Sequence, residues 1–244
     1  MDIPWVEEPV PYLTTEQMVE VDRAMMEDFE IDLVRMMENA GRNLAHLARS
    51  RFLGSDPRGK SVVVMAGTGG NGGGALVAAR RLHGYGAEVR VAITAEGDRM
   101  TAVPGHQLRI LEKLGVPILH KDLPYAAAEL IIDGVIGYSL QGDPRGRAAE
   151  LIQWANDADA PILALDAPSG LDTSTGAVFK PTIVATATMT LALPKEGLRT
   201  AGVADVVGEL YLADISVPRA LYAREPLNLD VGLIFARSDV VRLI

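Results

Sequence analysis

The 244-residue sequence contains no cysteine, which excludes disulfides, thiol catalysis and any cysteine-ligated metal site. It also has no run of Lys and Arg, and its formal net charge of −9 argues against a nucleic-acid partner, which requires a concentrated basic face. No stretch approaches the roughly 18 uninterrupted apolar residues of a membrane span. The acidic residues 1–10 lack a signal-peptide pattern. These absences predict a cytoplasmic enzyme or binding domain that uses neither nucleic acid nor a membrane.

The hydrophobic content of 48% is enough for one large domain with a sizeable core. Thr14 and Gln17 fit a capping box that begins a helix over 14–28, and apolar spacing indicates a second helix over 31–52. After residue 60, strands alternate with helices, which predicts a mostly parallel sheet covered on both faces. The expected strands are 61–66, 88–94, 116–119, 129–134, 161–166, 186–193 and 208–214, and the expected helices among them are 74–84, 105–114 and 145–157.

The two N-terminal helices are rich in methionine, and this feature allows two interpretations. Adaptable side chains of this kind often fill a core. The second helix, however, has apolar residues on both sides, which also suits a subunit interface. The methionines concerned are Met18, Met25, Met26, Met36 and Met37.

A glycine-rich loop follows the first expected strand, and six of the eight residues from Gly67 to Gly74 are glycine. Such a loop lets backbone N–H groups approach an anion, and a helix beginning near Gly74 adds its positive dipole end. A phosphate would suit this site, although glycines also serve close strand–helix packing. The dinucleotide pattern G-x-G-x-x-G, here Gly67, Gly69 and Gly72, is weak evidence when it stands alone. The P-loop pattern at 54–61 lies in the wrong context, between a helix and a strand.

Polar residues follow three expected strands. In an open α/β sheet ligands bind outside the carboxyl ends of the strands, so Asn71, Asp133, Asp166 and Ser169 should converge there. Hard oxygen donors suit a phosphate-bearing ligand with a cation nearby. None of the four histidines lies where it would serve Ser169 as a base. Lys195 also lies near a strand end, and we interpret it as a solvated lysine.

Six segments of the sequence stand out in order, namely MMENAG (36–41), AGTGGNGGGALVAAR (66–80), IIDGVIGYSLQGDPRG (131–146), LALDAPSGLDTSTG (163–176), TLALPKEGL (190–198) and GELYLADISVP (208–218). The elements D-x-P-S-G-x-D at Asp166–Asp172 and M-E-N-A-G are specific in combination. On these segments the sequence resembles the NAD(P)H-hydrate epimerase family, and the resemblance covers residues 12–218.

The resemblance implies a fold, an activity and an assembly. The fold is a three-layer α/β/α sandwich of Rossmann type with an N-terminal helical pair, and the assembly is a homodimer. The reaction is interconversion of the R and S forms of NADHX and NADPHX, which are hydrated at carbon 6 of the nicotinamide ring, so that a separate dehydratase can restore the cofactor. Residues 1–218 would form the epimerase-like domain, and the tail 219–244 resembles the start of a dehydratase domain.

The resemblance also assigns residues. Asn71, Asp133 and Ser169 match the positions that hold one potassium ion, and Asp166 is the candidate for the proton transfer that inversion of a hemiaminal carbon requires. The positions that match contacts to the hydrate are Gly70, Asn71, Gly72, Gly73, Gly74, Gly137, Tyr138, Ser139, Leu140, Gln141, Gly142, Asp143 and Asp166.

The glycine loop departs from the family pattern. That loop usually reads N-N-G-G-D-G, whereas this chain has Gly70 and Gly74 in place of an asparagine and the aspartate. An aspartate at position 74 is expected to tighten ligand binding, unless the backbone there has a positive φ. Two alternatives to an epimerase follow: a non-catalytic nucleotide-binding or scaffolding member, and an NAD-dependent oxidoreductase suggested by G-x-G-x-x-G alone.

Overall fold

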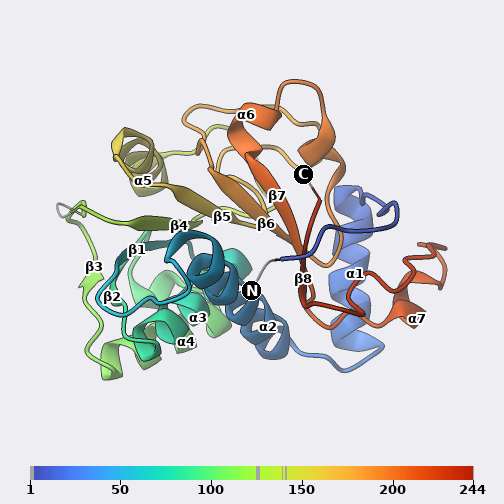
Figure 1. Cartoon of the computed structure of the whole chain (residues 1–244), viewed down its shortest axis with the longest axis horizontal. Helices are drawn as coiled ribbons and strands as arrows, with labels where there is room; N and C mark the ends of the chain where they lie inside the picture. The colour runs from blue at the N-terminus through green and yellow to red at the C-terminus, as the bar shows by residue number, and fades with distance from the viewer. Residues whose placement is uncertain (1–2, 125–126, 139, 141, 244) are drawn as a thin grey trace.

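A single eight-stranded sheet forms the centre of the computed structural model, which describes residues 3–124, 127–138, 140 and 142–243 (Figure 1). The strand order is β3-β2-β1-β4-β5-β6-β7-β8, and all neighbours are parallel except β7 and β8. The mostly parallel sheet predicted from the alternating pattern is confirmed. Its strands are β1 (Ser61–Ala66), β2 (Glu88–Ile93), β3 (Ile118–Leu119), β4 (Leu130–Gly134), β5 (Ile162–Leu165), β6 (Ala187–Leu191), β7 (Glu209–Ala213) and β8 (Val240–Arg242).

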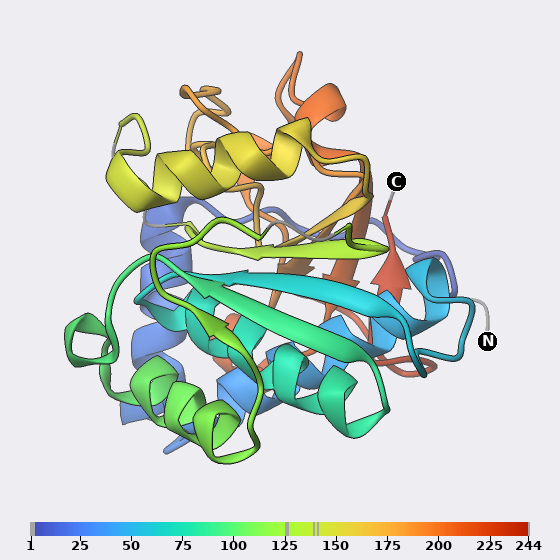
Figure 2. The same ribbon diagram turned by 90° about the vertical axis from the view of Figure 1, so that its left-hand side faces the viewer.

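Both faces of the sheet are covered by helices. Neighbouring side chains of a strand point to opposite faces and therefore belong to different cores. On β1, Val62 and Val64 belong to one core with the helices α2 (Leu33–Leu47), α3 (Gly70–Gly84) and α4 (Ala102–Lys113). Val63 and Met65 belong to a second core with α5 (Gly146–Asp157). Figure 2 shows α5 on one side of the sheet and the other three helices on the opposite side. The predicted three-layer sandwich is therefore confirmed.

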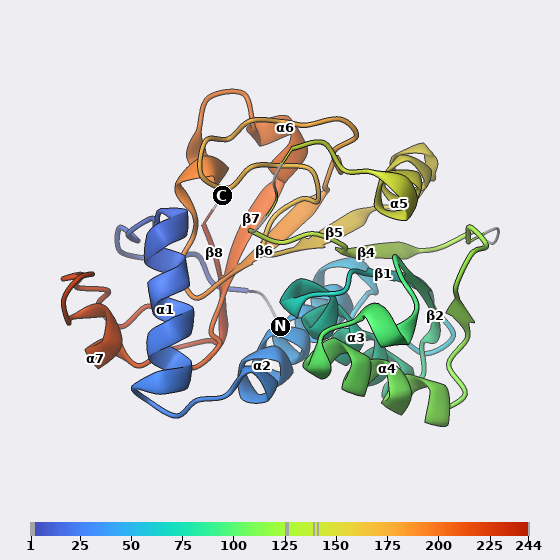
Figure 3. The ribbon, with the colours of Figure 1, turned by 180° about the vertical axis from the view of Figure 1, so that it is seen from behind.

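The predicted N-terminal helical pair is present as α1 (Thr15–Glu27) and α2, and α2 continues into a π-turn at Ala48–Phe52. Thr14 and Gln17 form the capping box reciprocally. Figure 3 shows α1 across the end of the sheet, beside the short α7 (Arg219–Tyr222). The methionines Met18, Met25, Met36 and Met37 are buried within this chain, which confirms their core interpretation, while Met26 is exposed.

Helix α3 begins at Gly70, so the predicted start near Gly74 is wrong by one turn. The amide of Gly73 donates to the carbonyl of Gly69 and closes the first turn within the glycine run. Glycine has a low helix propensity, but tertiary packing overrides that preference here. At Gly41 of α2, a Cβ would lie 2.5 Å from the Gly74 carbonyl oxygen, so the glycine in M-E-N-A-G allows α2 and α3 to approach closely.

The C-terminal tail joins the same sheet. Residues 240–242 form β8, a strand that the sequence did not predict because three residues are too few to show a period. The amide of Asn43 in α2 reaches the backbone carbonyl of Asp214, where β7 ends, at 2.7 Å. The boundary between residues 218 and 219 stays a prediction. Short helical turns complete the chain at Gly97–Arg99, Glu196–Arg199 and α6 (Ala204–Val207).

Within the described residues, no helix is long and apolar enough to cross a lipid bilayer.

Candidate functional site

A pocket of about 660 Å³ lies at the carboxyl ends of the central strands. Its walls come from α1, the start of α2, the β1–α3 loop, the end of β6 and the segments that follow β4, β5, β6 and β7. This is the edge at which ligands bind in open α/β sheets. Five residues predicted for the site contribute to its lining, namely Gly70, Asn71, Gly137, Tyr138 and Asp166.

Asp166 follows the last residue of β5 and has a left-handed backbone with φ of +66°, which ends the strand and turns the chain. Its side chain is 6% exposed. Oδ1 accepts hydrogen bonds from the Leu191 amide and the Thr190 hydroxyl, both at 3.3 Å, and from the Lys195 ammonium. No donor among the described residues is assigned to Oδ2. One carboxylate oxygen is therefore anchored, and the other is available to a ligand in the pocket.

Lys195 is fully buried, with an exposed fraction of 0%, so the interpretation of a solvated lysine is wrong. Its Nζ forms an ion pair with Asp166 and donates to the Leu191 carbonyl at 3.0 Å. The chain turns inward after β6 because Ala192 has a φ of +63°, which also ends that strand two residues before its predicted end. The Leu13 amide then donates to the Pro194 carbonyl at 2.8 Å, which fixes this segment against the chain that precedes α1.

A second pair of titratable groups lines the same pocket. The Tyr138 hydroxyl donates to Asp22 Oδ2 at 2.5 Å. Burial raises the pKa of Asp22, while the hydrogen bond from Tyr138 and the charge of Lys195 lower it in part. Burial and the neighbouring Asp22 raise the pKa of Tyr138 well above its ordinary value.

Tyr138 was expected at the site from the sequence, whereas Asp22 was not. The signal was present in the helix pattern, because Asp22 lies on α1 four residues after the buried Met18 and three before the buried Met25. A carboxylate at such a position on an apolar face requires a partner, and such groups are frequent at functional sites.

The amino terminus of α3 opens into the pocket at Gly69, Gly70 and Asn71. Gly69 is the N-cap and provides no side-chain oxygen, so the first N–H groups of the helix are left for solvent or a ligand. Unpaired amides at a helix start, together with the helix dipole, favour an anion such as phosphate. The anion site predicted from the glycine run therefore has a suitable geometry, at Gly70 rather than at Gly74.

Gly72, Gly73 and Gly74 are buried inside α3 and do not line the pocket. A Cβ at Gly72 would lie 2.0 Å from the Gly67 carbonyl oxygen, and a Cβ at Gly74 would lie 2.9 Å from Leu165 Cδ2. Gly72 and Gly74 therefore serve close packing of the helix, whereas a Cβ at Gly73 would make only ordinary contacts, the nearest with Met37 at 3.5 Å. Contact of these three glycines with a ligand stays a prediction.

Asp133 and Ser169 contact each other directly in the interior. Asp133 Oδ1 accepts from the Ser169 hydroxyl at 2.7 Å, and Oδ2 accepts from the Ser169 amide at 2.8 Å. Burial raises the pKa of Asp133 to about 6. Asn71 lies close by, since its side-chain amide donates to the Leu165 carbonyl at 2.9 Å and its Oδ1 faces Gly137.

The three predicted cation ligands suit a monovalent ion. Asp133 is a buried carboxylate with no ion-pair partner in the described part of the chain, and a bound cation would supply the missing positive charge. All three side chains offer hard oxygen donors. Across the described ranges no group of three His, Cys, Asp or Glu side chains could hold a metal, so a site for a transition metal is not indicated there.

Beyond Tyr138, no further described residue of segment 137–143 lines the pocket. Ser139 and Gln141 fall outside the described residues. Leu140, Gly142 and Asp143 are not part of the pocket lining, and Asp143 Oδ1 accepts from the Lys180 amide at 3.0 Å. The histidines, as predicted, are placed away from the site: His46 lies beside Arg49, His120 pairs with Glu96, and neither His83 nor His106 lines the pocket.

A family profile described as YjeF-related protein N-terminus matches residues 34–197, which include the glycine loop and both members of the Asp166–Lys195 pair. The chain belongs to this family. It is 41% identical over 217 residues to the NAD(P)H-hydrate epimerase of Dehalogenimonas lykanthroporepellens, covering 88% of this chain and 86% of that protein. It is 38% identical over 205 residues to the NAD(P)H-hydrate epimerase of Truepera radiovictrix, covering 84% and 87% respectively.

The chain is also similar to part of longer proteins. The bifunctional NAD(P)H-hydrate repair enzyme Nnr of Moorella thermoacetica is 33% identical over 225 residues, which are 88% of this chain but 42% of that protein. The crystal structure of yeast ynu0 (YNL200c) superposes with a TM-score of 0.82 at 23% identity, covering 96% of this chain and 100% of that one. That similarity supports the fold.

Proposed function

We propose that this protein is an NAD(P)H-hydrate epimerase that interconverts the R and S forms of NADHX and NADPHX. One observation carries the proposal: the buried Asp166–Lys195 pair faces a pocket that also contains the uncapped start of α3. The names of the family relatives that match most of this chain support the same reaction.

The pocket suits the two chemically different parts of the substrate. Phosphate groups would bind at the first amides of α3, at Gly70 and Asn71, where the helix dipole favours negative charge. The hydrated nicotinamide ring would then lie against Asp166. A volume of about 660 Å³ is within the range usual for pockets that take small molecules and cofactors.

Inversion at carbon 6 requires proton transfer at the hydroxyl of a hemiaminal. If the ring opens, the hydroxyl gives its proton to the Asp166 carboxylate, the bond from carbon 6 to N1 breaks with its electron pair going to N1, and closure on the other face takes the proton back. If the hydroxyl leaves as water, protonated Asp166 donates first and recovers the proton when water adds to the opposite face. Both routes use Asp166 Oδ2 as the proton carrier, because Oδ1 is bound to Lys195 and Leu191.

We further propose one potassium ion at Asn71, Asp133 and Ser169. It would neutralise Asp133 and stabilise the segments after β4 and β5, from which Gly137 and Asp166 reach the substrate. A homodimer, a cytoplasmic location and a separate dehydratase that consumes the product also stay predictions.

The alternative of a non-catalytic scaffolding member rested on the missing loop aspartate. In this structure position 74 lies beneath Leu165 and outside the pocket, so the glycine there leaves the lining intact. The oxidoreductase alternative rested on Gly67, Gly69 and Gly72, and two of these serve close packing: a Cβ at Gly67 would lie 1.9 Å from the Val135 carbonyl oxygen, and Gly72 packs on Gly67.

The decisive experiment is a turnover assay on a mixture of hydrate epimers with a stereospecific dehydratase supplied. The wild-type protein should accelerate the second phase, in which the remaining epimer is consumed. Asp166→Asn should lower that rate by about 10²–10⁴-fold, the usual value of general acid–base catalysis. Asp159→Asn, a matched change at an exposed site after α5, should keep the rate. A second phase no faster than the spontaneous one would refute the proposal.

A further inference from the structure

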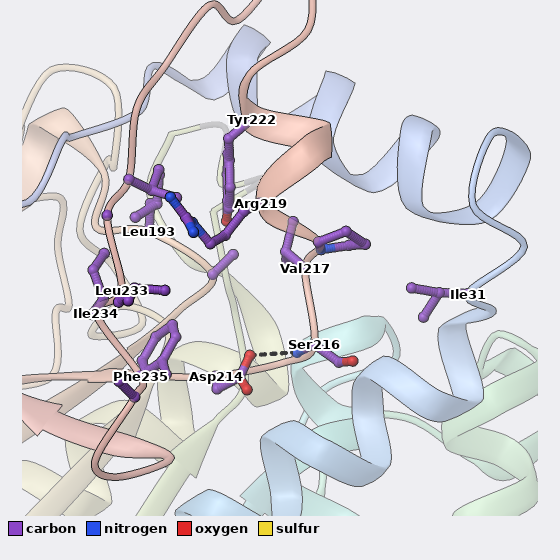
Figure 4. A pocket seen from close by; sticks show the side chains of 15 residues that line it. Ile31, Leu193, Asp214, Ser216, Val217, Arg219, Tyr222, Leu233, Ile234 and Phe235 are labelled. Atoms are coloured by element: carbon purple, nitrogen blue, oxygen red, sulfur yellow. Dashed lines mark hydrogen bonds between the residues drawn. The ribbon is translucent and has the colours of Figure 1, made fainter.

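A second cavity, of about 370 Å³, lies on the other side of the segment that follows β6. Its walls are Ala192 and Leu193, the chain after β7 from Asp214 to Arg219, helix α7 and the tail at 231–236 (Figure 4). Leu191 and Lys195 line the first pocket, whereas Ala192 and Leu193 line this cavity. In the chain after β7, Ile215 lines the first pocket and its neighbours line this cavity, so two short segments separate the two.

The lining of this cavity is mainly apolar, with side chains such as Ile31, Leu193, Val217 and Phe235. Tyr222 is the exception on α7. It is 4% exposed, and its buried hydroxyl has no hydrogen-bond partner within the described residues. Figure 4 shows that hydroxyl pointing away from α7 into the space beside segments 214–217 and 233–235. Because a buried polar group without a partner is costly, this one indicates a missing partner.

Asp214 is the second polar group of the cavity. Its Oδ1 accepts a hydrogen bond from the Ser216 amide at 2.6 Å, which holds Ser216 in a left-handed conformation with φ of +73°. No donor in the described part of the chain is assigned to Oδ2. Burial raises the pKa of Asp214, and the charge of Asp239 adds to this, while the hydrogen bond from the Ser216 amide and the charge of Arg42 lower it in part. The remaining charged lining group, Arg219, already lies 3.9 Å from Asp230.

We propose that this cavity is a second binding site, for a small apolar molecule that carries one protonated amino group. The ammonium group would donate to Asp214 Oδ2 and to the oxygen of Tyr222, and the apolar part would fill the space between Leu193, Val217 and Phe235. Hydrogen bonds to a charged partner are the stronger kind, and a partly buried carboxylate discriminates against anions. This site is distinct from the epimerase pocket and does not depend on the proposed function.

The test uses 2-phenylethylammonium chloride as the probe and 2-phenylethanol as a neutral compound of nearly the same size, with binding measured by titration calorimetry on the full chain. The ammonium compound should bind at least ~10-fold more tightly, the value of one charged hydrogen bond. Asp214→Asn should abolish that preference, since the amide keeps the acceptor for Ser216 but loses the charge. Tyr222→Phe should weaken binding of the ammonium compound, and it should leave the thermal stability of the protein unchanged or raise it.

Two outcomes would overturn the proposal. The first is equal binding of the two probes to the wild-type protein. The second is a preference for the ammonium compound that survives in Asp214→Asn, and if that preference disappears in Asp22→Asn, the probe binds in the first pocket. Because only binding is measured, failure here leaves the epimerase assay unaffected, and the two proposals can fail separately.

Discussion

The Lys195 ammonium group forms an ion pair with Asp166 in the interior of the protein, where the lysine side chain has no exposed surface. Lys195 has two further oxygen acceptors, the Leu191 carbonyl and the Thr190 hydroxyl, so its charge is well satisfied. In the proposed mechanism Lys195 is therefore a positioning residue, because its contact with Oδ1 leaves Oδ2 of Asp166 for the substrate.

Removal of one member of this pair should be more harmful than removal of both. Lys195→Met should lower the free energy of unfolding by about 3–5 kcal/mol, because it leaves the Asp166 carboxylate buried without its cation. The double variant Lys195→Met with Asp166→Asn should recover a large part of that loss. Urea denaturation of the four proteins measures the effect, and strictly additive losses would contradict the coupling.

Tyr138→Phe should raise the pKa of Asp22. The tyrosine hydroxyl donates to the charged carboxylate and so favours ionisation, whereas burial opposes it. With the donor removed, burial is opposed only by the charge of Lys195, so the carboxyl group takes up a proton at higher pH. A carbon-detected NMR titration of the Asp22 carboxyl measures the shift, with the exposed Asp159 as internal control. A lower or unaltered pKa would show that the hydrogen bond is absent in solution.

Stability should depend on pH through Asp133. Its pKa is about 6 in the folded protein, against an ordinary value of 3.8 for an aspartate in the unfolded chain, so the folded state binds a proton more strongly between these limits. As the pH rises from about 3 to about 7, wild-type protein in choline buffer should lose about 3 kcal/mol relative to Asp133→Asn, with little further change above pH 7. Urea denaturation of both proteins across this pH range measures the loss, and parallel stability curves would contradict it.

Potassium should reverse part of that loss. The ion favours the charged carboxylate, so the rise in Tm on addition of potassium chloride should be larger at pH 8 than at pH 4.5, where Asp133 is protonated. Choline chloride at equal ionic strength is the control. The same rise in Asp133→Asn as in the wild type would place any potassium effect at a different site.

The two substituted positions of the glycine loop should respond differently. Gly74→Asp should destabilise the protein by roughly 3 kcal/mol without tighter ligand binding, because the carboxylate would be buried between Ala40 and Leu165. This corrects the expectation of tighter binding from the sequence. Gly70→Asn should change the free energy of unfolding by less than about 1 kcal/mol. A Cβ at position 70 would lie beside the open pocket, with Met37 Sδ as its nearest neighbour at 3.8 Å. Thermal denaturation and NADPH titration of both variants measure the difference, and equal behaviour would contradict it.

The sequence by itself determined the layered architecture and the strand ends at which the site lies. Apolar runs such as Val62 to Met65 with helices between them require a parallel sheet covered on both faces, and such sheets bind ligands at their carboxyl edge. Asp133 and Asp166 could be located because each follows an apolar run directly. These are local properties, since periodicity and the place where it stops depend on neighbouring residues.

Tertiary structure alone decided which polar groups are buried and which pairs form. Lys195 follows a proline and an apolar run and has the sequence context of a surface lysine, but it is 29 residues from Asp166 and meets it only because Ala192 turns the chain inward. Asp22 and Tyr138 are 116 residues apart and meet only when α1 crosses the end of the sheet. Contacts of this kind depend on where the backbone places distant segments, so no local pattern specifies the partner of a buried charge.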